Sequence, residues 1–393
     1  MVVGERMNPP WSTFRAVSAN RLLWVVLFVE AALVMWLQSP WLFPDSAAYI
    51  RLAHGDASAF EVRMPGYALF LALLRNHAVA VAVQMLLYLA SLALVASLFR
   101  RQDRFVFLGL AIFYVFPFFY SAAILSEGLA IFCVALTMWL IVRRKSWLAV
   151  GAMAGACVLV RGDLVPIIPA VLLVALWRRA WVGAASCAAA AFIVLLPCLI
   201  WNATHYGRFT PLPVRPAVGQ SLYIASWEST MSLKDLKIVS GAPPTAAAKA
   251  SGLADEVAAI RARGGTTEVY RDAALKRLAA HPADTALHSI KAIWRLFNTA
   301  DYPAPRPVAF CLSLVSAIVW LLGFCGIVWV MLKRTAPRSP AVIFLLVLAA
   351  HLPLHTEARY TAVLRLILLF YAARLIVDAS GFPKRRLERH QTA

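Results

Sequence analysis

The chain has 393 residues, of which 62% are hydrophobic and only 15% are charged. A soluble domain of this length cannot bury so much apolar surface, so the composition excludes an ordinary globular protein and predicts a polytopic membrane protein. The net charge of +19 does not indicate nucleic-acid binding, because most Arg and Lys residues stand in short clusters between apolar runs, as anchors at the cytoplasmic leaflet do.

Ten apolar runs follow one another along the chain, and a membrane-crossing helix needs about 20 apolar residues. The runs cover residues 22–38, 78–99, 105–123, 128–142, 147–160, 164–176, 181–201, 308–332, 341–352 and 360–377. Basic clusters close every second boundary, which predicts an even number of spans with both chain ends in the cytoplasm. We therefore expect an all-α polytopic membrane protein with about ten transmembrane helices.

These runs divide the chain into three parts. Residues 1–201 form an N-terminal transmembrane region of seven spans, with a first external loop at 40–77. Residues 202–306 form a long external loop. Residues 307–393 form a C-terminal transmembrane region of three spans, followed by a basic cytoplasmic tail.

Some features inside the runs have more than one interpretation. The three shortest runs, which begin at Trp147, Leu164 and Ala341, are short spans or re-entrant helices, which periodicity does not distinguish. Glu30 in the first run is typical of a transport or proton-relay residue, although a protonated Glu hydrogen-bonded between helices is the simpler interpretation. All six cysteines stand in apolar runs without ligand-like neighbours, so we expect small buried hydrophobic residues rather than disulfides or a metal site.

The long loop has helical patterns of its own. Segments 246–263 and 267–281 alternate Ala, Leu and charged residues at helical spacing, with a Gly-Gly pair between them. Segment 283–297 is amphipathic, and its apolar side consists of Leu287, Ile290, Ile293, Trp294 and Phe297. Such a face packs against neighbouring helices or lies on the membrane surface, so we expect a helical lid rather than a separate module.

Polar residues concentrate in the loops on the predicted external side, beginning with Asp45. It stands a few residues beyond the first run, and Tyr49 follows it at helical spacing. A carboxylate near the water–lipid boundary is suited to accept a proton. The segment Pro44-Asp45-Ser46 is also typical of a helix start with Asp as the N-cap, and both interpretations can hold together.

The second feature is the sequence RMPGY at residues 63–67. Its Pro-Gly pair predicts a tight turn before a helix that begins at Tyr67, with Arg63 held at the start. A fixed guanidinium suits a phosphate, although an arginine that snorkels to the membrane interface is the common alternative.

Three more external segments contain ionisable residues. Glu127 opens the fourth span, where the helix dipole favours an acid and simple capping is the alternative to a functional role. Arg161 and Asp163 flank a glycine in a tiny turn, where a local ion pair is the alternative. The sequence HTEARY leads into the last span and contains His355, Glu357, Arg359 and Tyr360.

Together these loops place acids and arginines on one side of the membrane. The acids are Asp45, Glu127, Asp163 and Glu357, and the arginines are Arg63, Arg161 and Arg359. This composition suits a substrate with a phosphate to be held and a hydroxyl to be deprotonated. The sequence has no P-loop, nucleophile elbow, paired-Cys zinc site or Rossmann turn, so we expect an activated lipid to supply the energy.

These motifs resemble the GT-C superfamily of membrane glycosyltransferases. The similar features are an Asp just after the first span, R-x-P-G-Y before the second, Ser-Glu opening the fourth and E-x-R-Y opening the last. The chain looks most like the branch that contains protein O-mannosyltransferases and the lipid A aminoarabinose transferase. The stretch AAHPADTALHSIKAIWRLF is also similar to a recurrent helix of bacterial members.

The resemblance implies an inverting enzyme of the bacterial inner membrane whose site faces the periplasm. Such enzymes move a sugar from a polyprenyl-phosphate carrier to a hydroxyl of a lipid, glycan or protein acceptor. Asp45 matches the general base, and Glu127 matches a second acid that orients the acceptor or helps to bind a divalent cation, Mg²⁺ or Mn²⁺. Many relatives have another acid directly after the first, where this chain has Ser46.

The other implied site residues bind substrate. The lipid phosphate would be held by Arg63, Arg161 and Arg359, with Tyr360 as a hydroxyl donor. The remaining substrate-binding candidates are Tyr49, Tyr67, Asp163, His355 and Glu357.

Two alternative functions stay open. A lipid-linked sugar flippase or transporter would also carry ionisable residues, but transporter sites lie near the midplane, often with internal repeats, whereas these residues collect at one surface. A glycan polymerase or ligase that uses diphosphate-linked lipids shares the chemistry and requires a different arrangement of external loops.

Overall fold

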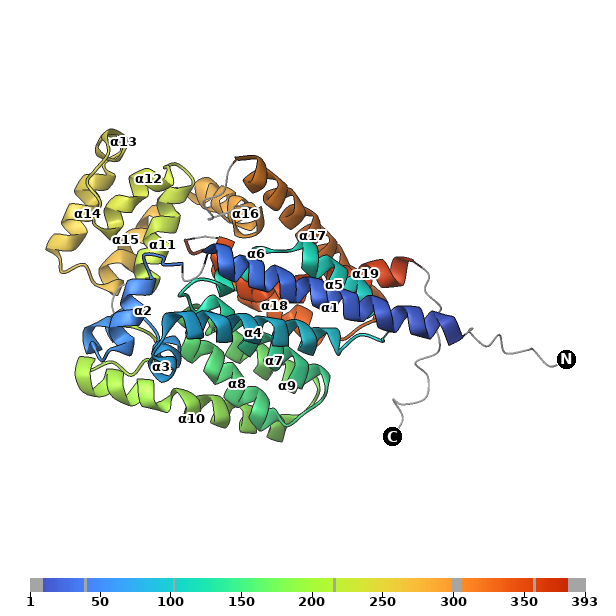
Figure 1. The fold of residues 1–393 in the computed structure, drawn as a ribbon. Helices are drawn as coiled ribbons and strands as arrows, with labels where there is room; N and C mark the ends of the chain where they lie inside the picture. Colours follow the sequence, from blue (N-terminus) through green and yellow to red (C-terminus); the bar gives the residue numbers. More distant parts are fainter. Residues whose placement is uncertain are drawn as a thin grey trace.

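The computed structural model describes residues 10–38, 41–101, 103–214, 217–298, 306–355 and 358–380. Over these residues the chain forms nineteen α-helices and no β-strand (Figure 1). The predicted all-α class is therefore confirmed.

The N-terminal membrane region contains ten α-helices and two short 3₁₀ turns. The helices are α1 (Pro10–Gln38), α2 (Ser46–Ala53), α3 (Pro65–Leu74), α4 (His77–Ala96), α5 (Arg104–Phe113), α6 (Phe116–Ser121), α7 (Glu127–Val142), α8 (Trp147–Val160), α9 (Ile167–Trp177) and α10 (Trp181–Tyr206). The 3₁₀ turns are η1 (Ala57–Glu61) and η2 (Gly162–Leu164).

The predicted third span, 105–123, is two helices rather than one. Helix α5 ends at Phe113, and α6 begins at Phe116 with Pro117 in its first turn. A proline inside a continuous helix would remove a hydrogen bond and clash with the preceding turn, whereas the first turn accepts it. The break therefore lies just before Pro117.

Residues 217–298, here called the loop subdomain, contain the helices α11 (Ala217–Glu228), α12 (Leu233–Leu236), α13 (Ala246–Ala250), α14 (Leu253–Ala262), α15 (Thr267–Ala280) and α16 (Pro282–Asn298), with a 3₁₀ turn, η3 (Lys237–Ser240). Its hydrophobic core, which includes Tyr223, Trp227 and Ile260, is separate from the core of the membrane region. The predicted helix 246–263 is broken in two, because Gly252 takes a left-handed conformation with φ of 77°.

The C-terminal membrane region contains α17 (Arg306–Lys333), α18 (Ser339–His351), a 3₁₀ turn η4 (Ala358–Leu364) and α19 (Arg365–Ala379). The predicted last span, 360–377, thus begins as 3₁₀ helix. Helices α17 and α19 pack closely, because Gly326 brings the two backbones so near that a Cβ there would lie 2.2 Å from the carbonyl oxygen of Tyr371.

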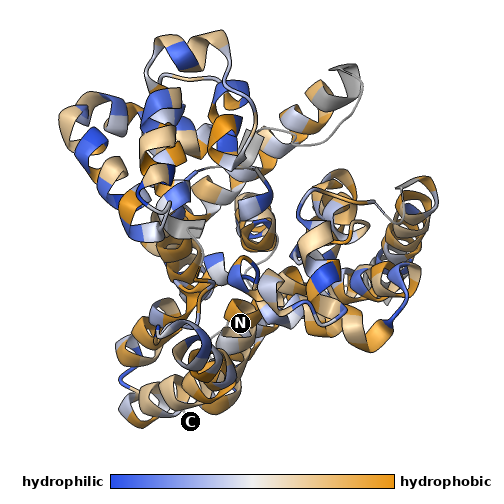
Figure 2. Ribbon diagram, turned by 90° about the vertical axis from the view of Figure 1, so that its left-hand side faces the viewer, coloured by the Kyte–Doolittle hydropathy of each residue, from blue (hydrophilic) through white to orange (hydrophobic). Residues whose placement is uncertain are grey.

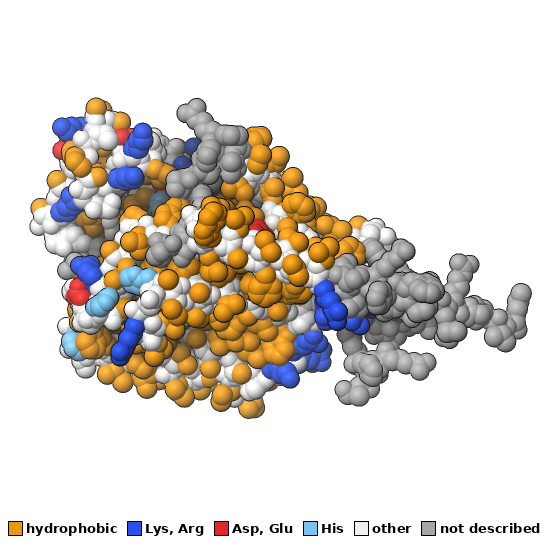
Figure 3. All heavy atoms as spheres, in the orientation of Figure 1, with side chains coloured by type: hydrophobic (Ala, Val, Ile, Leu, Met, Phe, Trp, Pro, Cys, Tyr) orange, Lys and Arg blue, Asp and Glu red, His pale blue; other side chains and the backbone are white. Residues whose placement is uncertain are grey.

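Four helical segments in the described part of the chain are long and apolar enough to cross a membrane: Asn20–Leu37, His77–Ala96, Trp181–Tyr206 and Phe310–Lys333. The other apolar helices are shorter, so these findings support a membrane protein without establishing ten spans. Figure 2 shows hydrophobic residues along the helices of the membrane region. Figure 3 shows apolar side chains over the middle of the molecule, with Lys and Arg toward its ends.

The cysteines are free, and four of them are buried as predicted. Cys311 and Cys325 are exposed instead, which corrects the prediction for these two. They lie on α17, whose outer side also exposes Phe310 and Leu314. On a helix of a membrane bundle, such exposed apolar residues suit contact with lipid rather than with the protein core.

Candidate functional site

Asp45 holds two arginines from distant parts of the chain. Its Oδ1 accepts a hydrogen bond from Nη2 of Arg63, and its Oδ2 accepts one of 2.7 Å from Nη1 of Arg359, 314 positions along the chain. Asp45 precedes α2 but makes no side-chain cap bond, and its backbone is helical rather than extended. The capping interpretation of this carboxylate is therefore wrong, and both of its oxygens are occupied by guanidinium groups.

Glu127 and Asp163 share a third arginine, Arg161. Nη1 of Arg161 lies 2.6 Å from Oε1 of Glu127, while its Nη2 and Nε lie 2.7 and 3.0 Å from the two oxygens of Asp163. The Arg161 and Glu127 side chains are only 8% and 2% exposed. The expected local ion pair of Arg161 with Asp163 is confirmed, and its fork geometry fixes the guanidinium.

Burial and charge act in opposite directions on this second cluster. Burial opposes ionisation of Asp163, but the positive charge of Arg161 and a contact with His351 outweigh it and hold the pKa of Asp163 below its usual range. Burial likewise opposes the charge of Arg161, but Asp163 and Glu127 raise its pKa well above the usual value. Arg161 and Asp163 therefore stay ionised as a pair.

Two tyrosines connect the two clusters. Tyr49 donates a 3.2 Å hydrogen bond from its hydroxyl to Oγ of Ser126, and Arg63 lies 5.7 Å from the centre of its ring. Tyr360 lies between the arginines of both clusters, with Arg161 and Arg359 at 5.9 and 5.5 Å from its ring centre. Guanidinium groups at these distances are attracted to the aromatic face.

Tyr67 packs against the ring of Tyr49. Its ring is fully buried and meets the ring of Tyr49 edge-on at 4.9 Å, and its hydroxyl donates a 2.6 Å hydrogen bond to Gln84. Gln84, a polar residue inside an apolar run, also donates to the carbonyls of Ala123 and Leu125, just before Glu127. Sequence analysis missed Gln84, although a buried amide in an apolar helix is a usable signal of a fixed backbone nearby.

The Pro-Gly pair of the RMPGY segment has a different role from the one predicted. Pro65 and Gly66 form the first turn of α3 itself rather than a turn before it. A Cβ on Gly66 would lie 2.6 Å from the carbonyl oxygen of Leu159, so glycine is required for α3 to approach the end of α8. This contact brings the start of α3, which Arg63 precedes, close to the end of α8, which Arg161 follows.

The loop before Asp45 is tied to the segment before Glu127. Trp41 and Ala123 form an isolated β-bridge, in which the N–H of Ile124 donates to the carbonyl of Trp41 at 2.9 Å. Oγ of Ser46 donates a 2.7 Å bond to the carbonyl of Ile124. These hydrogen bonds hold the loop that contains Asp45 against the segment that precedes Glu127.

His355 contacts the loop subdomain rather than the two clusters. Its Nδ1 lies 2.5 Å from Oε1 of Glu228, the last residue of α11, and its ring meets that of Tyr360 at 6.3 Å. The Glu228 side chain is fully buried, with His288 and Arg295 of α16 at 3.8 and 3.5 Å. Burial lowers the pKa of His288 despite the nearby carboxylate.

Sequence analysis missed Glu228, although it joins the loop subdomain to His355, just before η4. No spacing in the sequence indicates this contact, because His288 and Arg295 lie in a distant segment of the chain. The predicted site residue Glu357 lies outside the described residues.

The carboxylates as they stand do not form a set of metal ligands. No three His, Cys, Asp or Glu side chains gather as such a set in the described part of the chain. Asp45 and Glu127 are each paired with arginine, which repels a cation. This arrangement therefore does not suit a divalent cation.

No protein-family model, curated protein or solved structure matches this chain.

Proposed function

We propose that this chain is a membrane glycosyltransferase of the GT-C type, which moves a sugar from a polyprenyl-phosphate carrier to an acceptor hydroxyl. The observation that supports it best is the meeting of Asp45 with Arg359 at 2.7 Å, with Arg63 on the other oxygen. A proton acceptor and two phosphate-binding groups thus occur at one place. The Asp45 side chain is 23% exposed, so a substrate can reach it.

The proposed reaction is a single displacement with inversion. The acceptor hydroxyl oxygen bonds to the anomeric carbon, while the bond from that carbon to the phosphate oxygen breaks and its electron pair leaves with the lipid phosphate. The hydroxyl proton passes to the Asp45 carboxylate. The negative charge that develops on the phosphate is stabilised by the guanidinium groups of Arg63 and Arg359.

Without substrate, each oxygen of Asp45 accepts a hydrogen bond from one of these arginines, so the arginines compete with an acceptor hydroxyl for the carboxylate. An incoming phosphate offers the arginines a stronger partner, since fork-like contacts to phosphate are particularly favourable. In this proposal donor binding draws the arginines away and frees Asp45. The carboxylate is then most accessible to the acceptor hydroxyl when the leaving group is in place.

The Glu127–Arg161–Asp163 cluster serves as a fixed support. Arg161 is held by three contacts and is nearly buried, so it does not move with substrate as Arg359 does. Glu127 has one oxygen, Oε2, without a hydrogen-bond partner in the described structure. That oxygen could orient an acceptor hydroxyl, and Tyr360 would then lie between the supporting cluster and the phosphate.

The shorter helices are proposed to complete a bundle of about ten spans in the bacterial inner membrane. Helix α7 has 16 residues and is therefore about 24 Å long, most of the hydrocarbon thickness of about 30 Å. It begins at Glu127 and is followed by Arg143, Arg144 and Lys145. The positive-inside rule then places those basic residues and both termini in the cytoplasm and the Asp45 site in the periplasm.

The test uses the full chain in liposomes, with polyprenyl-phosphate hexoses and pentoses labelled in the sugar and a membrane extract as acceptor. We expect Asp45→Asn to lower label transfer by at least a hundredfold, since general-base catalysis contributes about 10²–10⁴-fold. Asp56→Asn is the matched control. Asp56 is exposed in the same external loop and bonds only locally, to Ser58, with a weak 3.8 Å contact to Arg51.

Transfer that survives in Asp45→Asn would remove this residue from the role of base. Movement of labelled donor across the bilayer without label transfer would support a flippase. Transfer only from diphosphate-linked sugars would support a polymerase or ligase.

A further inference from the structure

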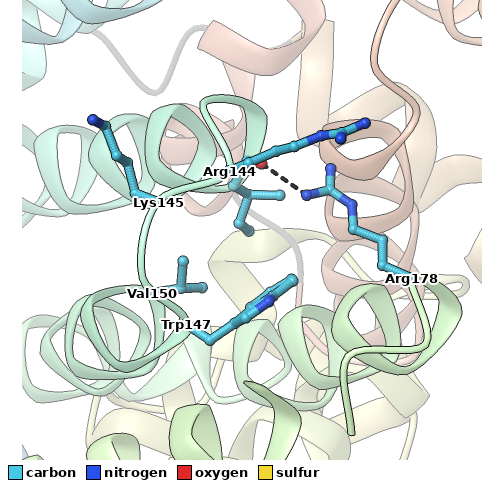
Figure 4. A pocket seen from close by; sticks show the side chains of 6 residues that line it. Arg144, Lys145, Trp147, Val150 and Arg178 are labelled. Atoms are coloured by element: carbon cyan, nitrogen blue, oxygen red, sulfur yellow. Dashed lines mark hydrogen bonds between the residues drawn. The ribbon is translucent and has the colours of Figure 1, made fainter. Parts of the chain in front are cut away.

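The helices that carry Glu127, Arg161 and Asp163 enclose a second site at their other ends. A pocket of about 370 Å³ lies where α7 ends, α8 begins and α9 ends. It is lined by Ile141, Arg144, Lys145, Trp147, Val150 and Arg178 (Figure 4). The pocket therefore lies at the opposite end of these helices from the proposed catalytic site.

Arg178 is held by contacts with three surrounding helices. Its Nη1 donates a 2.9 Å hydrogen bond to the carbonyl of Ile141, and its Nη2 donates one of 2.6 Å to Oγ of Ser339. Its guanidinium lies 5.9 Å from the ring centre of Trp147. Three contacts from three helices thus hold this cation on the pocket wall, although Arg178 remains exposed to solvent.

A second arginine shares this wall. Arg144 follows α7 with a left-handed backbone, φ 51°, and Figure 4 shows its side chain extending to the same side of the pocket as Arg178. Burial and then the positive charge of Arg144 lower the pKa of Arg178. Two guanidinium groups that repel each other in this way are stabilised by an anion placed near both.

None of the residues lining this pocket is acidic. Another basic group on the chain differs in this respect, because Arg100 and Arg374 act on the carboxylate of Asp103. The Arg144–Arg178 pair can therefore bind an anion from outside the protein, whereas Arg100 and Arg374 already face the carboxylate of Asp103.

We propose that this pocket binds a phosphate group, supplied by the headgroup of an anionic phospholipid. Planar guanidinium groups match the geometry of a phosphate, and basic pockets between membrane helices bind anionic headgroups. The volume suits a headgroup rather than a whole lipid. Large apolar side chains beside the pocket are exposed, among them Leu148 and Trp177 at 60% and 51%, and would contact the acyl chains. Free phosphate ions are the other source of the same chemistry.

The test measures binding of phosphatidylglycerol, phosphatidylcholine and inorganic phosphate to the full-length protein in detergent, by native mass spectrometry for the lipids and calorimetry for the ion. The variant Arg144→Gln/Lys145→Gln removes two positive charges from the pocket. The control Arg179→Gln/Arg334→Gln removes two positive charges from residues that do not line it.

We expect phosphatidylglycerol to bind at least tenfold more weakly to the pocket variant than to wild type, and equally well to the control variant. Weak binding of phosphatidylcholine is also expected, because its own cation opposes the arginines. If only inorganic phosphate binds, and the pocket variant loses this binding, the pocket is a phosphate site whose ligand is the free ion rather than a lipid headgroup. Equal binding to all three proteins, or equal loss in both variants, would overturn the proposal.

Discussion

Gly66→Ala tests the packing that positions Arg63. A Cβ at residue 66 would lie 2.6, 2.7 and 2.9 Å from three backbone atoms of Leu159 and Val160. Backbone atoms cannot rotate away as a side chain can, so α3 would have to move by about 1 Å to restore ordinary contact. Overpacking of this kind costs about 1–3 kcal/mol.

The matched control is Gly109→Ala, in the interior of α5, where an added Cβ meets nothing within 4 Å. The free energy of unfolding of this variant should be about 0.5–1 kcal/mol higher than that of wild type, because alanine favours a helix more than glycine does. Both free energies of unfolding can be measured by denaturant titration of the protein in the same detergent. We expect the free energy of unfolding of Gly66→Ala to be lower than that of wild type, and that of Gly109→Ala to equal or exceed it.

The displacement of α3 also moves Arg63 relative to Asp45. A misplacement of about 1 Å at a positioning residue can lower a rate by about a hundredfold, so transfer should fall more than stability explains. If Gly66→Ala is as stable as Gly109→Ala, the close approach of α3 to α8 is wrong, and so is the placement of Arg63 that depends on it.

Three further predictions concern the buried ion pairs. Arg161→Met should destabilise the protein by about 3–5 kcal/mol in the same unfolding assay, because it leaves Glu127 buried without its cation; a loss below 1 kcal/mol would contradict the buried geometry. Burial raises the pKa of Asp163, but Arg161 lowers it by more. The stability that this carboxylate contributes is therefore complete above about pH 4 and is lost as the pH falls further. An acid titration of Asp163→Asn should lack this loss. Glu228→Gln alters the buried carboxyl group that His355 contacts, so limited proteolysis should cleave residues 217–298 faster than in wild type. Unchanged cleavage would argue against this anchor.

The sequence predicted the helical class and most helix ends well, because long apolar runs and basic clusters are strong local signals. Helix α8 begins and ends at the predicted residues, and α10 and α17 differ only near their ends. The breaks in the predicted helices 105–123 and 246–263 were missed. Pro117 and Gly252, which occur at these breaks, were available in the sequence as signals.

At the candidate site the sequence predicts several of the residues but not the contacts between them. The motifs around Asp45 and Arg359 singled out two residues that the structure brings into contact, but no spacing predicts that both arginines occupy the Asp45 carboxylate without substrate. Glu228 was missed because its partners His288, Arg295 and His355 come from distant segments. Contacts of that kind depend on tertiary packing, which a single sequence does not reveal.

Binding of a short-chain polyprenyl monophosphate to purified protein tests most directly whether Arg359 holds a lipid phosphate in competition with Asp45. The measurement uses the Arg144→Gln/Lys145→Gln background, so that the pocket at the other end of α7 does not contribute. We predict that Arg359→Gln binds at least tenfold more weakly, whereas Asp45→Asn binds as tightly as the background protein or more so, because Arg359 is released from its carboxylate partner. Equal binding by Arg359→Gln and the background protein, or an equal loss in both variants, would contradict the account.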